Sequence, residues 1–236
     1  MARNVDETEW LTRSTAPLRL ARYVQTTTSS RKLQILSCAA CRLIEHHLRR
    51  PELLDDLLTV ERFAFGELSG ADYYDSLSAV TTELHRTHRQ YGEDISPIIA
   101  ATRAIAAAGS GNVVAGMLRT FEWVLIAGKD DANLPILLCD LVREIVGNPF
   151  RLWRIQSPWL ATGMRFAPDG SSLGVSTAAF ELATIIDSER RFELLPILAD
   201  ELESLGWADQ GILHHCRNGK GHRRGCWAVD VVLGRE

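Results

Sequence analysis

The chain has 236 residues, of which 46% are hydrophobic and 24% are charged, as in an ordinary globular protein with a sizeable core. Its net charge of −4 argues against general nucleic-acid binding, which usually needs a basic excess. No apolar stretch approaches the roughly 20 residues that cross a bilayer, and no charged start precedes an apolar run. We therefore expect a cytoplasmic protein that does not enter a membrane.

Helix signals dominate residues 1–150. A short helix is expected around Trp10, and Pro17 opens another. Farther along, apolar residues recur at steps of three and four, which is helical periodicity. Ser69 or Asp72 is suited to cap a helix that carries Tyr73. Gly147 fits a left-handed C-cap. The remaining helices of this region are predicted over residues 31–50, 51–65, 95–108, 113–127 and 134–146.

The sequence changes character over residues 151–173, where tryptophan, proline and glycine replace the periodic pattern. We interpret this stretch as an irregular connector. Two helices are predicted over residues 175–204, with Pro196 in the first turn of the second, and Asp209 is expected to cap a short helix that runs to about Cys216. The apolar tail from residue 226 to 233 does not distinguish helix from strand.

These elements predict an all-α fold, a compact array of helices. It has an irregular connector near residues 150–173 and a C-terminal loop that contains cysteine and histidine. The sequence suggests an N-terminal helical region, residues 1–150, followed by a connector and a C-terminal helical region, residues 151–236. We expect the two regions to pack as one domain.

Several motifs occur in a fixed order along the chain. They are RKLQILSCAACR (31–42), GNPFR (147–151), PWL (158–160), LPILADELESLG (195–206), ILHHCR (212–217) and HRRGCWAVDVVLG (222–234). Together they resemble an uncharacterised family of helical proteins that is greatly expanded in planctomycete bacteria. The resemblance implies a shared architecture and no particular activity. In that family the paired cysteines and the HC…H…RGCW pattern occur together. One departure is Trp207, which stands where the family often has cysteine.

The cysteines and histidines near the two ends of the chain predict a metal site. Cys38 and Cys41 lie three residues apart, which places both sulfurs on one face of a helix. Three further ligands are predicted near the other end, and His215 is a substitute for one of them. Zinc takes four nitrogen or sulfur ligands in a tetrahedron. The predicted ligands are Cys38, Cys41, Cys216, His222 and Cys226.

The same cysteines have a simpler interpretation as core residues, because a free thiol packs like a small hydrophobic group. The ten-residue spacing from Cys216 to Cys226 fits no common zinc pattern. A thioredoxin-type redox pair is disfavoured, since no strand precedes Cys38.

Four cationic residues cluster in the loop that follows His215. They are Arg217, Lys220, Arg223 and Arg224. Such a cluster can bind a phosphate, a nucleic-acid backbone or an acidic protein partner. The alternative is a solvated turn, partly neutralised by the nearby carboxylates of Asp200, Glu201 and Glu203.

We therefore predict a non-enzymatic helical binding or scaffold module. A Cys/His zinc site would stabilise it, and its basic C-terminal loop would contact a protein or nucleic-acid partner. The alternative is an enzyme or nucleic-acid-processing component in which His222 and the neighbouring arginines act on phosphate. A second alternative is a thiol-based redox sensor, in which Cys38 or Cys226 reacts readily.

Overall fold

The computed structural model describes residues 5–12, 15–48, 51–73, 75, 96–151, 164–166, 172–174, 177–207 and 209–235. The chain divides into two compact units, Met1–Asn148 and Pro149–Glu236. This division falls beside residue 150, where the sequence changes character. Nearly all regular structure in the described residues is helical, so the predicted all-α class is confirmed.

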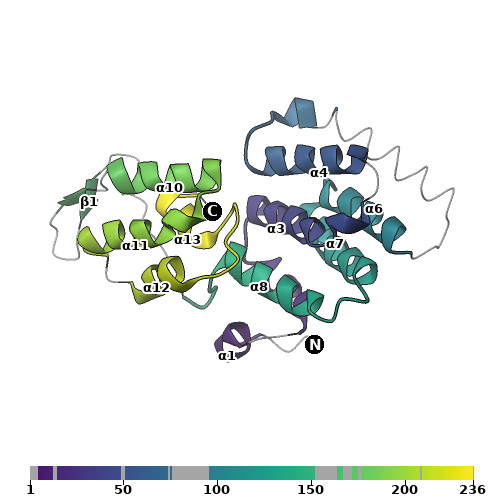
Figure 1. Cartoon of the computed structure of the whole chain (residues 1–236), viewed down its shortest axis with the longest axis horizontal. Coiled ribbons are helices and arrows are strands. Elements are labelled where there is room, and N and C mark those ends of the chain that lie inside the picture. Colours follow the sequence, from purple (N-terminus) through teal and green to yellow (C-terminus); the bar gives the residue numbers. More distant parts are fainter. Residues whose placement is uncertain are drawn as a thin grey trace. The chain divides into compact units, whose positions relative to one another are not determined.

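The first unit contains the helices that the periodicity predicts (Figure 1). They are α1 (Glu7–Leu11), α2 (Pro17–Val24), α3 (Ser30–Arg42), η1 (Glu45–His47), α4 (Pro51–Ala64), α6 (Pro97–Ala108), α7 (Val113–Ala127) and α8 (Leu134–Val146). Ser69 accepts a hydrogen bond from the amide of Asp72, as expected of a helix cap. Most of the helix predicted there falls on residues 76–95, which lie outside the described residues. Gly147 has the predicted positive φ of 76°, although its ψ of −156° is not that of a left-handed helix.

Helix α3 is shorter than its apolar periodicity suggests. It ends at Arg42, and the amides of Leu43 and Ile44 bond to carbonyls three residues back, at Ala40 and Cys41. This tightened turn leads into the 3₁₀ helix η1. The prediction of one continuous helix over residues 31–50 is therefore wrong beyond residue 42.

Helix α3 is the centre of the first unit and packs against α4, α6, α7 and α8 (Figure 1). Residues 32–38 are all buried. Among them, Lys32 donates from Nζ to the carbonyl of Ile145 at 2.8 Å, which satisfies one of the last carbonyls of α8. Arg42 forms a two-pronged ion pair with Glu61, with N–O distances of 2.8 and 2.7 Å, and so connects α3 to α4.

Helices α6 and α7 pack closely because Gly116 has no side chain. A Cβ atom at this position would lie 2.5 Å from the carbonyl oxygen of Ala107 and 3.0 Å from the Cβ of Ser110. The side chain of Thr120, one turn later, donates to the carbonyl of Ala104 at 3.3 Å. The two helix backbones therefore approach too closely for a methyl group.

We expect Gly116→Ala to destabilise the protein. Overpacking costs about 1–3 kcal/mol, which exceeds the gain of about 1 kcal/mol that alanine has over glycine inside a helix. Urea unfolding measures the difference. Gly111→Ala is the matched control, since its Cβ would meet no atom within 4 Å. A Gly116→Ala protein as stable as the parent would contradict the close approach.

The second unit holds a short hairpin and a group of helices. Strand β1 (Met164–Phe166) pairs antiparallel with β2 (Ser172–Gly174), and Arg165 lies opposite Leu173. This hairpin lies in the stretch predicted to be irregular. The turn-forming sequence PDG separates the strands along the chain, and it is the signal for a hairpin. The helical elements are α10 (Thr177–Glu189), η2 (Phe192–Leu194), α11 (Leu195–Ser204), α12 (Gln210–Asn218) and α13 (Trp227–Leu233).

Helix α11 packs between α10 and α12, and α13 lies against α10 (Figure 1). Pro196 stands in the first turn of α11, as predicted. The carboxylate of Asp209 accepts the amides of Gly211 and Ile212 and so caps α12, also as predicted. The apolar tail, which the sequence did not assign to helix or strand, forms the helix α13. On α10, the buried Asp187 lies 2.6 Å from Arg235 and 3.7 Å from Arg224, residues that flank α13.

Candidate metal centre

Helix α12 has an apolar face and a polar face. Ile212, Leu213 and Cys216 are buried in the core of the second unit, whereas His214 is exposed. His215 lies between the two faces and is half-buried. The helix ends when the amide of Gly219 bonds to the carbonyl of His215 at 2.8 Å.

The loop after α12 turns back toward that helix. Gly221 and Gly225 have φ angles of 72° and 86°, a region that glycine enters without strain. The chain then starts α13, and Cys226 is its N-cap residue. The loop therefore brings His222 and Cys226 back to the last turn of α12.

Three donor atoms converge at this point, one each from His215, His222 and Cys226. They lie within 4.8 Å of one another. The Nε2 atom of His215 is 3.2 Å from the sulfur of Cys226, and the two imidazole rings meet edge to face with centroids 4.9 Å apart. Cys226 is fully buried, and both histidines are half-buried.

This geometry suits zinc. Bond lengths of about 2.1 Å to nitrogen and 2.3 Å to sulfur place neighbouring donors roughly 3.4–3.7 Å apart in a tetrahedron. The separation of His215 and Cys226 is close to that range, and the His222 donor lies within 4.8 Å of both. Two imidazoles and one thiolate are ligands that zinc binds well.

Gly219 provides the space that His222 occupies. A Cβ atom on Gly219 would lie 2.3 Å from Cε1 and 2.5 Å from Nε2 of the His222 ring, and 2.5 Å from the backbone oxygen of His215. The His222 ring thus lies directly against the backbone where α12 ends. Trp227 borders the site on another side, with its ring centroid 5.0 Å from that of His215.

The other predicted ligands are buried cysteines. Cys216 belongs to the core of the second unit. Cys38 and Cys41 are buried in α3 of the first unit, so the site that they were predicted to share with the C-terminal residues stays a prediction. Burial raises the pKa of the Cys38 thiol well above its usual value, and the neighbouring Cys41 and Glu61 add to the effect. Burial, followed by Glu61, likewise raises the pKa of Cys41. A raised pKa lowers the fraction of reactive thiolate at neutral pH, so we expect these two thiols to react slowly, and alkylation of the native protein tests the redox-sensor alternative.

Two of the four predicted partner-binding cations form ion pairs within the second unit. Arg217 lies 2.6 Å from both Asp200 and Glu203, and its hydrogen bonds to Glu203 and Asp200 raise its pKa. Arg224 faces the buried carboxylate of Asp187. This agrees with the alternative in which nearby carboxylates neutralise part of the loop.

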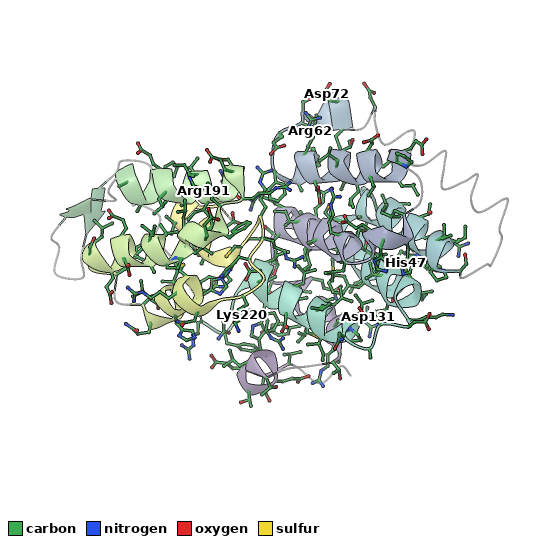
Figure 2. All side chains as sticks on the ribbon, viewed as in Figure 1. His47, Arg62, Asp72, Asp131, Arg191 and Lys220 are labelled. Carbon is green, nitrogen blue, oxygen red and sulfur yellow. The ribbon has the colours of Figure 1, made fainter. Side chains whose placement is uncertain are left out.

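The other two predicted cations lie in the loop itself. Lys220 is exposed (Figure 2), and Arg223 is half-buried, with its Nε 3.5 Å from the carbonyl oxygen of Gly221. Lys220 is the exposed cation of the surface that the sequence predicts to contact a partner.

Comparison of the chain with known protein families, with curated proteins and with solved structures finds no match. The resemblance to the planctomycete family therefore stays a prediction. Across the described residues, no helix has both the length and the apolar character that a membrane crossing requires.

Proposed function

We propose that the chain is a helical binding module whose second unit holds a zinc ion through His215, His222 and Cys226. The observation that carries the proposal is the convergence of these three donors at the end of α12. The loop of residues 219–225 has no regular secondary structure, and a metal bound by His222 within it and by His215 and Cys226 on either side would fix it. Metal binding of this kind contributes directly to folding free energy.

The arginines give less support to the alternative function, in which His222 and its neighbours act on phosphate, than to a binding module. Arg217 already binds two carboxylates, and a phosphate would have to displace them. Arg224 faces Asp187, whose carboxylate is shielded from water. Contact with a partner would then depend mainly on the exposed Lys220, which suits a small acidic surface on a protein better than an extended nucleic-acid backbone.

Metal analysis of the purified full chain tests the proposal. We expect about one zinc per chain, bound by the donor types that zinc prefers. His222→Ala and Cys226→Ser should each lose the metal. His214→Ala is the matched control, because His214 is exposed on the same helix and belongs to no donor cluster in the described residues, and it should keep the zinc.

Cobalt substitution provides a second readout that reports directly on the ligand atoms. A thiolate ligand gives Co²⁺ an intense sulfur-to-metal absorption band, which Cys226→Ser should abolish and Cys216→Ala should keep. If Cys38→Ser and Cys41→Ser remove the zinc while His222→Ala retains it, the metal belongs to the first unit and the proposal is wrong.

A further inference from the structure

A pocket of about 210 Å³ opens in the first unit, where the ends of three helices meet. Leu43 and Ile44 follow the last residue of α3, Ala127 ends α7, and Leu134 begins α8. These side chains form its apolar part. Its polar part consists of His46, His47, Asp130 and Asp131. Figure 2 shows His47 and Asp131 near one another on this unit.

The charges around the pocket favour a cation. Helices α3 and α7 both end here, and the last carbonyls of a helix carry partial negative charge. Asp130 and Asp131 add two exposed carboxylates. The N-terminus of α8 has the opposite polarity, and Asp131 offsets it by accepting the amide of Asn133 at 2.8 Å.

The imidazole of His47 does not cancel this negative charge at neutral pH. Its ring is in contact with that of His46, with centroids 4.1 Å apart. Burial lowers the pKa of His47, and the neighbouring His46 lowers it further, while Asp130 acts in the opposite direction. A histidine with a lowered pKa is neutral at pH 7. Neutral imidazoles are hydrogen-bond acceptors as well as donors, so they can receive an N–H group of a ligand.

We propose that this pocket binds a small organic cation, with its ammonium group at the carboxylates of Asp130 and Asp131. A compact aliphatic part packs on Ile44 and Leu134. A bare metal ion fits less well, because the donor atoms of these side chains do not gather as those of His215, His222 and Cys226 do. The volume is below the range of about 300–1,000 Å³ that is usual for drug-sized ligands, so the ligand is small.

Titration of the ¹⁵N-labelled full chain with isobutylammonium chloride tests the proposal, with isobutanol as the neutral probe of the same shape. A ligand of about five heavy atoms should bind with a Kd in the millimolar range. We expect amide shifts over residues 44–48 and 127–134, and much weaker binding of isobutanol. Equal binding of the two probes, shifts elsewhere or no binding would overturn the proposal.

Variants give an independent check. The double change Asp130→Asn and Asp131→Asn keeps the shape and the capping oxygen, and should weaken isobutylammonium binding by about three- to tenfold, as expected for exposed charge pairs. Asp55→Asn, on the exposed surface of α4, is the control and should bind as the parent does. An unchanged Kd in the double variant would also overturn the proposal.

Binding should depend on pH in a defined direction. His47 becomes protonated only below the ordinary histidine value of about 6.5, because burial and the neighbouring His46 lower its pKa, and the imidazolium then repels the ammonium group. Isobutylammonium should therefore bind more weakly at about pH 5 than at about pH 7.5. Binding that strengthens on acidification would contradict this arrangement of charges.

Discussion

Replacing Gly219 by alanine is expected to lower the zinc affinity of the second unit by about 10–100-fold, the range seen when groups that orient metal ligands are disturbed. The new Cβ would meet the His222 ring and the backbone oxygen of His215 at 2.3–2.5 Å. The ring can rotate away, but the backbone of α12 cannot, since its last turn is hydrogen-bonded. The loop would therefore shift and carry the His222 nitrogen away from Cys226.

A competition titration against a chelator of known zinc affinity measures this change. Gly70→Ala is a suitable control, because its Cβ would meet no atom within 4 Å. The control should bind zinc as the parent does. If Gly219→Ala binds as tightly as the parent, His222 does not coordinate the metal from this position. That result would leave only His215 and Cys226 as donors of the second unit.

Phe121→Ala is expected to destabilise the protein by about 3–5 kcal/mol, which is a large share of the 5–15 kcal/mol that typically stabilises a domain. Phe121 is fully buried on α7, on the same helix face as Met117 and Val124. Truncation removes its apolar contacts and leaves a cavity, because α3, which packs on α7, is itself buried and has little freedom to fill the space.

Denaturant unfolding measures this loss, and Phe180→Ala is the control. Phe180 is 42% exposed on α10, so its truncation should change the free energy of unfolding much less, by about 1 kcal/mol or below. A cost below about 1 kcal/mol for Phe121→Ala would mean that α7 does not pack as the structure shows.

The helices of the first unit were largely predictable because their local signals agree with their packing. α7 and α8 begin and end at the residues that the apolar runs and their flanking asparagines and glycines indicate. The end of α3 was not predictable, since Ile44 and Leu48 continue its apolar period. Both side chains are buried, but Ile44 lies in the turn before η1 and Leu48 is the residue after it. Periodicity records burial and does not distinguish these geometries.

Helical periodicity could have identified some of the candidate metal ligands but not others. His215 and Cys216 are neighbours on α12, so they point about 100° apart and only one of them can face the loop. Cys216 lies four residues after Ile212 and three after Leu213, which assigns it to the apolar face. This periodicity was available in the sequence and would have made His215 the principal ligand. For Cys38 and Cys41 no such signal exists, because three-residue spacing suits a ligand pair and a core pair equally.

The position of Asp187 has a consequence for the last helix of the second unit. With seven residues, α13 is too short to persist as an isolated helix. Arg224 precedes it and Arg235 follows it, and both face the one carboxylate that α10 keeps away from water. Opening either flank of α13 would leave the buried carboxylate of Asp187 with one fewer cationic partner. We therefore expect the order of this segment to depend on its packing against α10, so that the two helices open together.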